Sequence, residues 1–233
     1  MKKILFGFSM LALGLTSCSN NNEKTATPPP ADTVKVVEKK AEFQPFDIVE
    51  IDHTVKNYDK WRPGFNTDST NRIASGLEFI VIGRGMDNAN SLAIFLKAAD
   101  VQKAKDFANN PRLKDIMQKN GVMTKPDISY QHVIRFNADS KEKQWVSIKH
   151  KVKDFDAWVK VYDSEGTATR ATFGLVDVLL ARGNDDPNMV YIIFDITDMA
   201  KAKARMSDPA LKQLMTDAGV EGKPQITFYT TAD

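Results

Sequence analysis

The side chains of this chain that could do chemistry occur in two matching segments. The first is HTVKNYDKW, from His53 to Trp61, and the second is HKVKDFDAW, from His150 to Trp158, 97 residues later (150 − 53 = 97). Imidazole titrates near neutral pH, so either histidine could act as a general base, hydrogen-bond a ligand or bind heme iron. The alternative is a half-buried histidine at the end of a strand, hydrogen-bonded only to the backbone.

The two tryptophans allow two interpretations. Trp61 and Trp158 could line a pocket for a flat ligand between a helix and a sheet. Alternatively, they belong to the hydrophobic core, because in both copies three aromatic residues at positions i, i+3 and i+7 form one apolar stripe on a helix. These residues are Tyr58, Trp61 and Phe65 in the first copy, and Phe155, Trp158 and Tyr162 in the second.

Arginines also recur at matching positions. Arg84 and Arg182 end a predicted strand and could bind a carboxylate bidentately at a pocket mouth. The alternative is an ion pair with Asp87 or Asp185 in the adjoining turn. Two further arginines fall in the last turn of a predicted helix, where the helix dipole favours a cation: Arg72 and Arg170.

Each copy predicts the element order β-α-β-β-α-β. Alternating apolar residues indicate the strands, 47–54, 77–84, 91–97 and 127–134 in the first copy, and 145–152, 175–182, 189–195 and 225–231 in the second. Asn57 and Asp154 are expected to cap the first helix of each copy. In the first copy, Pro63-Gly64 predicts a kink or a late start of that helix.

This order is that of the ferredoxin-like fold, in the α+β class. A single such sheet has one face covered by helices and one bare apolar face. Two copies can bury their bare faces against each other, at about 25 cal/mol per Å². We therefore predict two tandem ferredoxin-like βαββαβ repeats, 45–136 and 144–233, joined by the linker 137–143. They form an intrachain pseudo-dimeric α+β barrel with four helices outside, and this pairing predicts a monomer.

The motifs of the second copy resemble the dimeric α+β barrel superfamily, which contains the antibiotic-biosynthesis-monooxygenase-like domains. The motifs are His150…Trp158, Arg170…Gly174, Arg182-Gly-Asn-Asp-Asp-Pro-Asn188, Pro209-Ala-Leu-Lys212…Met215 and Ala218-Gly-Val220. The first copy departs from them at 86–90 and 120–122. The resemblance covers nearly all of residues 46–233. It implies relatives that include cofactor-free monooxygenases, heme-degrading enzymes, heme-dependent dismutases and plain ligand binders, so it specifies the fold better than the chemistry.

The N-terminus has the pattern of a bacterial lipoprotein signal. Two lysines precede an apolar run, 4–15, that is too short to cross a bilayer and ends in Leu15-Thr-Ser-Cys18. The resemblance implies removal of residues 1–17, a lipid such as palmitate on Cys18 and a cell-envelope location, with Ser19 favouring the outer membrane. The alternative is an ordinary secretory signal with an incidental cysteine. Residues 18–44 are polar and predict a disordered tether, although 34–37 could add an edge strand.

Composition excludes several classes of function. Removal of residues 1–17 leaves 30 basic and 30 acidic residues, because that segment contains two of the 32 Lys and Arg and no acid, so the chain is not expected to bind nucleic acid. Cys18 is the only cysteine, which rules out intrachain disulfides. His132 is the only other histidine, and no metal-binding, phosphate-loop or dinucleotide motif is present. No metal and no cofactor are expected.

Three hypotheses follow. The first is a lipid-anchored protein that binds a small flat or apolar ligand in a helix–sheet cleft, lined by His150, Trp158 and Arg182. His53, Trp61 and Arg84 would line the weaker duplicate. The second is a cofactor-independent oxygenase with His150, or His53, as general base. The third is an interaction module whose outer helices contact another envelope protein, which a large exposed apolar patch would favour.

Overall fold

The computed structural model describes residues 43–232. The predicted signal peptide 1–17, the lipidation site Cys18, the tether up to residue 42 and the alternative strand 34–37 lie outside the described residues. Among residues 43–232, none of the helices has the length and apolar character needed to cross a bilayer.

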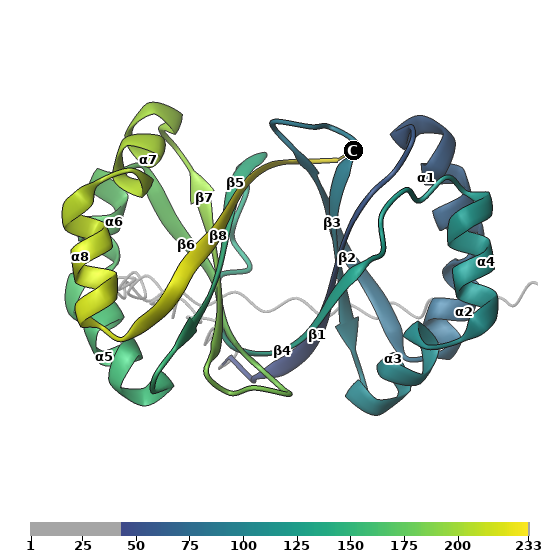
Figure 1. Ribbon diagram of the computed structural model, residues 1–233, viewed down its shortest axis with the longest axis horizontal. Coiled ribbons are helices and arrows are strands. Elements are labelled where there is room, and N and C mark those ends of the chain that lie inside the picture. Colours follow the sequence, from purple (N-terminus) through teal and green to yellow (C-terminus); the bar gives the residue numbers. More distant parts are fainter. Residues whose placement is uncertain (1–42, 233) are drawn as a thin grey trace, which may run out of the picture. The chain divides into compact units, whose positions relative to one another are not determined.

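Eight antiparallel strands close into a barrel in the order β1-β3-β2-β8-β5-β7-β6-β4 (Figure 1). The strands are β1 (Phe46–Thr54), β2 (Leu77–Gly85), β3 (Ser91–Ala98), β4 (Asp127–Phe136), β5 (Gln144–Val152), β6 (Leu175–Gly183), β7 (Met189–Ile196) and β8 (Val220–Thr231). The two copies join where β2 pairs with β8 and where β4 pairs with β6. The predicted α+β fold, a tandem ferredoxin-like barrel, is confirmed.

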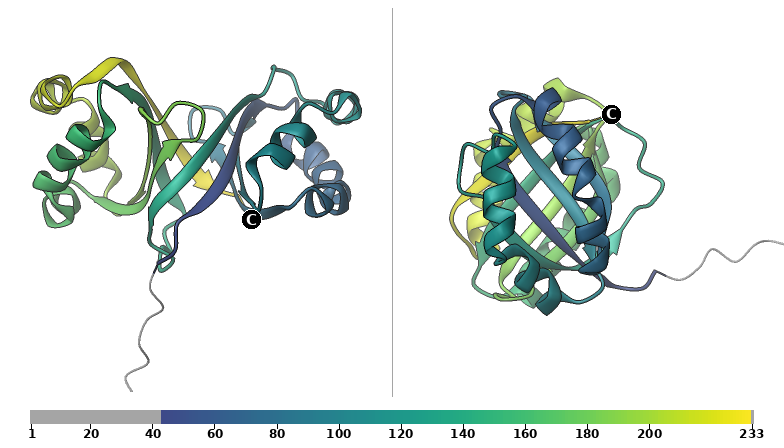
Figure 2. Two further views of the ribbon diagram at one scale, coloured as in Figure 1. Left: turned by 90° about the horizontal axis from the view of Figure 1, so that it is seen from below. Right: turned by 90° about the vertical axis from the view of Figure 1, so that its right-hand side faces the viewer.

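Helices cover the outside of the barrel, those of each copy over its own strands (Figures 1 and 2). They are α1 (Tyr58–Thr67), α2 (Ser69–Ala74), α3 (Val101–Ala108), α4 (Pro111–Lys119), α5 (Phe155–Glu165), α6 (Thr167–Thr172), α7 (Met199–Met206) and α8 (Pro209–Asp217). Each of the four predicted helices is divided into two consecutive helices. α1 starts at Tyr58 and runs through Pro63, so the late start is not found. The breaks lie at Asp68 and at Gly166, whose φ is +77°.

The helix starts follow the predicted capping residues. The side chain of Asn57 accepts a hydrogen bond from the amide of Lys60 at 2.9 Å, and that of Asp154 accepts one from Ala157 at 2.7 Å. These bonds satisfy amides that otherwise have no partner in the first turn of a helix. Each capped helix therefore begins at a fixed distance from the strand before it. This distance sets where the first aromatic stripe meets the sheet.

Alternation along β1 divides its side chains between two environments. Val49 faces the helices and joins a core cluster with Trp61, whereas Ile48 faces the barrel interior. One end of the interior is filled by aromatic rings, with Trp145 stacked on Tyr229 at 4.4 Å between ring centroids. The prediction that this inner face is apolar is only partly right, because charged residues occupy the other part of the interior.

Candidate functional site

In each copy, the structure brings the predicted histidine and tryptophan together beneath the helices. The ring centroids of His53 and Trp61 are 5.7 Å apart, and those of His150 and Trp158 are 5.3 Å apart, both edge to face. All four side chains are buried. The histidine comes from the end of β1 or β5 and the tryptophan from α1 or α5, so the pair marks the cleft between sheet and helix.

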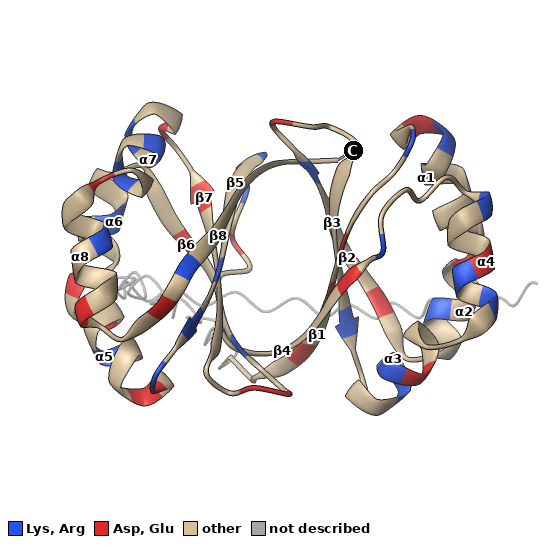
Figure 3. Cartoon of the chain, in the orientation of Figure 1, with Lys and Arg blue, Asp and Glu red and all other residues tan. Residues whose placement is uncertain are grey.

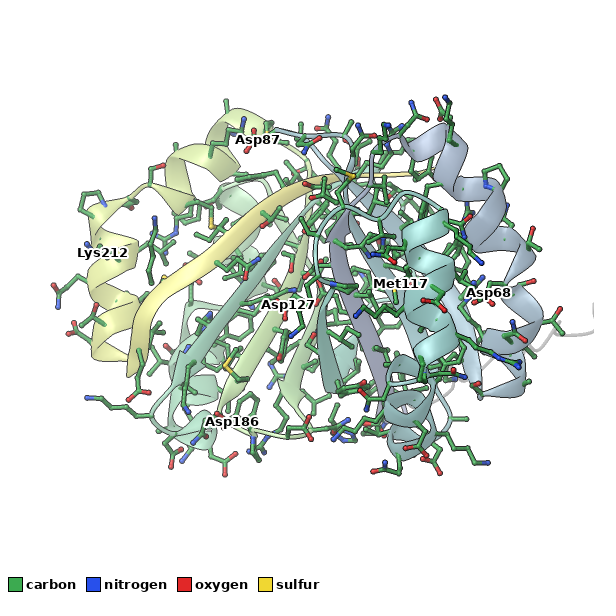
Figure 4. The ribbon with its side chains drawn as sticks, turned by 45° about the vertical axis from the view of Figure 1, so that its right-hand side comes forward. Asp68, Asp87, Met117, Asp127, Asp186 and Lys212 are labelled. Atoms are coloured by element: carbon green, nitrogen blue, oxygen red, sulfur yellow. The ribbon has the colours of Figure 1, made fainter. Side chains whose placement is uncertain are left out.

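Both clefts contain a cavity. The one in the second copy measures about 80 Å³, and the one in the first copy about 70 Å³. Most of the lining is apolar, and His150 and Trp158 contribute to the larger cavity. The break between α1 and α2, together with α4, supplies residues such as Asp68 and Met117 to the smaller one (Figure 4). Each predicted histidine therefore borders an apolar cavity.

The two histidines are polar groups without partners among residues 43–232. Within this range, neither ring nitrogen of His53 or His150 has a hydrogen-bond partner, so the backbone-bonded alternative is not found. Burial lowers the pKa of each histidine to about 4, because the apolar surroundings disfavour the charged ring. At neutral pH, each ring is therefore uncharged and offers one donor and one acceptor to the cleft.

Arg84 and Arg182, predicted to bind a ligand, lie outside the clefts. The guanidinium of Arg84 lies 4.2 Å from the ring centroid of Tyr58 and donates to the carbonyl of Ala89 at 2.8 Å. Arg182 lies in the same way over Phe155, at 4.4 Å, and donates to the carbonyl of Pro187 at 3.1 Å. Both therefore fasten a turn to the first aromatic residue of a helix. The ion pairs with Asp87 and Asp185 are not found, and Asp185 binds Lys105 instead.

Arg72 and Arg170, which the sequence assigns to the helix dipole, line the cavities instead, one in each copy, and Arg205 joins Arg170 in the second. Arg170 is 4% exposed and donates to both carboxylate oxygens of Asp177, at 2.8 and 2.6 Å. Burial alone would lower its pKa, but Asp177 more than offsets this and raises it. Arg72 donates to the carbonyl of Phe65 at 2.7 Å, and burial lowers its pKa. In the sequence, the recurrence of these two arginines in both copies is the one feature that could have marked them as site residues.

No protein-family model matches the sequence, and no curated protein matches it. Solved structures do match. An anthrone oxidase-like protein has a TM-score of 0.55 at 12% identity, over 81% of this chain and 92% of that one. A monooxygenase candidate from Lactobacillus acidophilus has a TM-score of 0.52 at 16% identity, over 80% and 94%. A heme-binding protein from Thermus thermophilus has a TM-score of 0.50 at 10% identity, over 82% and 92%.

The chain has the fold of the dimeric α+β barrel superfamily. At these identities the likeness establishes the fold alone. The predicted fold is thereby confirmed, and the chemistry has to be argued from the clefts and from the interior of this dimeric α+β barrel.

The interior of the dimeric α+β barrel holds a charged cluster that the sequence analysis missed. Lys149 on β5 binds Glu50 on β1, with 3.1 Å between Nζ and Oε1, and also binds Asp52 on β1. Gln131 on β4 donates to the other carboxylate oxygen of Glu50 at 2.7 Å. Glu50 is 1% exposed, so the cluster lies inside the barrel. Because Glu50 and Asp52 belong to the first copy and Lys149 to the second, the cluster joins the two copies.

One ammonium group faces two carboxylates in this cluster. Burial raises the pKa of Glu50 to about 7, although Lys149 opposes the rise. Burial also raises the pKa of Asp52. For Lys149, burial alone would lower the pKa, but the two carboxylates more than offset this and raise it. Lys149 therefore remains charged, and burial brings the pKa of Glu50 close to neutral pH.

The charges on the surface and the possible metal ligands do not indicate another candidate site. Acidic and basic residues alternate along the helices (Figure 3). Within residues 43–232, no three His, Cys, Asp or Glu side chains are grouped to hold a metal ion. The third histidine, His132, lies 2.9 Å from Asp47 at the surface. The two clefts thus remain the candidate sites.

Proposed function

We propose that this chain is a ligand-binding protein that takes a small, single-ring apolar molecule in the cleft of the second copy. The observation that carries the proposal is the buried imidazole of His150, which has no hydrogen-bond partner in the described part of the chain and lines an apolar cavity. A buried polar group without a partner costs about 1–3 kcal/mol. A ligand that bonds His150 recovers part of that cost.

The size of the cavity limits the ligand. A volume of about 80 Å³ is roughly half of the ~150 Å³ apolar cavity that takes benzene. One ring therefore fits only if the cleft expands. Met206 and Met215 line the cavity, and methionine side chains adapt readily. Pockets that enclose drug-sized ligands measure about 300–1,000 Å³, so a macrocycle such as heme is far too large for this cavity.

A second candidate function is that of a cofactor-independent oxygenase in which His150 is the general base. The unbonded ring nitrogen in a mostly apolar cleft favours it, because a base must reach the substrate proton directly. The lowered pKa of His150, about 4, opposes it, because a general base works best with a pKa near the operating pH. Ligand binding is therefore the function that the geometry supports best.

The interaction module has less support. Within the described part of the chain, the large apolar side chains exposed on helices are Ile73 on α2 and Leu214 on α8. They belong to different copies, so they do not form one patch. Single exposed apolar residues are common on soluble proteins.

We expect binding to be measurable with tryptophan fluorescence, because the three tryptophans report on three places. Trp61 and Trp158 line the two clefts, and Trp145 lies in the barrel interior. With Trp61→Phe and Trp145→Phe, emission reports on the second cleft alone. Titration with phenol should give a saturable change, and His150→Leu should weaken binding about tenfold, as expected for one lost hydrogen bond of ~1.4 kcal/mol.

The matched control is Arg182→Met, which removes a conspicuous arginine outside the cleft and should leave phenol affinity unchanged. A reporter with Trp61 as the sole tryptophan tests the first cleft in the same way. If phenol gave no saturable change with either reporter, the proposal would be overturned. Oxygen uptake measured in the same titration decides between binding and oxygenation.

The N-terminal motif supports a further part of the proposal, attachment to the outer membrane of the cell envelope through a lipid on Cys18. Multiple acyl chains anchor a protein firmly, since each buried methylene contributes about 0.8 kcal/mol. We expect labelled palmitate to be incorporated into the full-length chain and Cys18→Ala to abolish it, moving the protein from the membrane to the soluble fraction. Equal labelling of both proteins would contradict this.

A further inference from the structure

Three charged side chains line the otherwise apolar cavity of the second cleft: Glu165, Arg170 and Arg205. Glu165 lies between the two arginines, 2.5 Å from Nη2 of Arg205 and 3.6 Å from Nη1 of Arg170. The side chains of Arg170 and Arg205 are only 4% and 11% exposed. Two largely buried guanidinium groups thus point at one carboxylate in the cavity wall.

Both arginines are held in place without Glu165. Arg170 keeps its bidentate pair with Asp177. Arg205 lies 3.2 Å from Asp208, and its guanidinium lies 4.5 Å from the ring centroid of Phe173. A pair of guanidinium groups fixed in this way is already arranged for a carboxylate, which reduces the entropy lost on binding.

Glu165 lies at a break in the helical backbone. It is the last residue of α5, and the helix breaks at the next residue, Gly166, which has a φ of +77°. A Cβ atom placed on Gly166 would meet nothing within 4 Å, so there is open space beside the break. Glu165 can therefore turn away from the arginines without disturbing a helix.

The first cleft lacks this arrangement. In the later part of each repeat, equivalent positions are 98 residues apart, as Gly121 and Gly219 are (219 − 121 = 98). Arg170 corresponds to Arg72, but Arg205 corresponds to Phe107, an apolar residue that lines the first cavity. Of these two cavities, only the second is therefore lined by two arginines.

We propose that the second cleft recognises a single-ring aromatic carboxylate, whose acidic group replaces Glu165 between Arg170 and Arg205. This inference rests on the proposed function and adds the class of ligand. The ring enters the apolar cavity beside His150 and Trp158. One carboxylate takes the place of another, so no buried charge is left unpaired and the cost of a broken buried ion pair is avoided. The space vacated by Glu165 also enlarges the cavity.

The test compares benzoate with benzyl alcohol, its uncharged relative, in the reporter whose only tryptophan is Trp158. We expect benzoate to bind at least tenfold more tightly than benzyl alcohol. Glu165→Gln should tighten benzoate binding severalfold, because the internal carboxylate no longer competes. Arg205→Met should weaken benzoate binding at least tenfold and leave benzyl alcohol within twofold. The reporter for the first cleft, Trp61, should show no preference for benzoate.

Each outcome separates this inference from the proposed function. If benzyl alcohol binds and benzoate binds no better, the carboxylate proposal is overturned while the ligand-binding function stands. If neither compound binds, the carboxylate proposal is overturned, and the phenol titration separately decides whether the ligand-binding function stands. Should Arg205→Met fail to fold, Glu165→Gln still decides the question, since unchanged benzoate affinity in that variant would contradict displacement of Glu165.

Discussion

Replacing Lys149 by methionine will lower the free energy of unfolding by about 3–5 kcal/mol, the usual cost of removing one partner of a buried ion pair. Lys149 supplies the ammonium that faces Glu50 and Asp52 inside the barrel. Without it, Glu50 at 1% exposure must either remain charged in an apolar interior or take up a proton. Chemical denaturation at pH 7 measures this loss.

Lys151→Met is the matched control. Lys151 lies two residues further along β5, but its side chain is 50% exposed and its partner, 2.8 Å away, is Asp186 at the surface. Exposed ion pairs contribute about 0–1 kcal/mol, so this variant should be nearly as stable as the wild type. Equal losses in the two lysine variants would contradict the assigned role of the buried cluster. Adding Glu50→Gln and Asp52→Asn to Lys149→Met should recover much of the stability.

The cluster also explains why one copy pairs with the other. Asp52 and Lys149 occupy equivalent positions, each directly before the repeated histidine, yet they carry opposite charges. Two first copies facing each other would bury like carboxylates at this point, and two second copies would bury two ammonium groups. Either arrangement is unfavourable in a low-dielectric interior. The charges therefore favour the pairing of unlike copies that the structure shows.

The sequence was sufficient for the fold because the fold depends on local patterns. The alternation of apolar residues predicts the strands, Asn57 and Asp154 predict the helix starts, and the sequence repeat predicts the barrel. The clefts also followed from spacing, since His150 and Trp158 are fixed by one strand and one capped helix. Arg182 was misassigned because its place at the end of a strand says nothing about which side of the sheet the guanidinium reaches.

The charged cluster could not be predicted for a different reason. Alternation placed Glu50 and Asp52 on the same face of a strand, but an isolated strand does not reveal whether that face meets solvent or a closed barrel. Their partner, Lys149, is 97 residues away from Asp52. Only closure of the barrel brings these residues together, so their charges looked like an ordinary solvated face. Arg170 is similar, because its burial depends on Asp177 in the next strand.

The pH dependence of stability will show a contribution from Glu50. The pKa of this group is raised in the folded barrel from its ordinary value of 4.5 to about 7. Between these two values, the folded state holds a proton that the unfolded state has released, so stability falls as the pH rises. The contribution is fully present below about pH 4.5 and is lost above pH 7. A shift of this size corresponds to about 3 kcal/mol.

Two other groups act in the opposite direction over an overlapping range. The pKa values of His53 and His150 are lowered from 6.5 to about 4, so stability is lost as the pH falls below 6.5. The wild-type curve alone would therefore mix the two effects. The difference between wild type and Glu50→Gln removes the histidine contributions, because both proteins contain these residues.

We expect this difference to change by about 3 kcal/mol between pH 4.5 and pH 8, with the wild type losing stability relative to Glu50→Gln as the pH rises. Denaturant titrations at several pH values measure it. The groups around Glu50 are Lys149, Asp52 and Gln131, with Tyr191 and Tyr229 from the opposite strands. Of these, Lys149 stays charged throughout this range, so it does not produce the slope. A difference that is constant with pH would show that Glu50 remains ionised, with Lys149 serving both carboxylates at once.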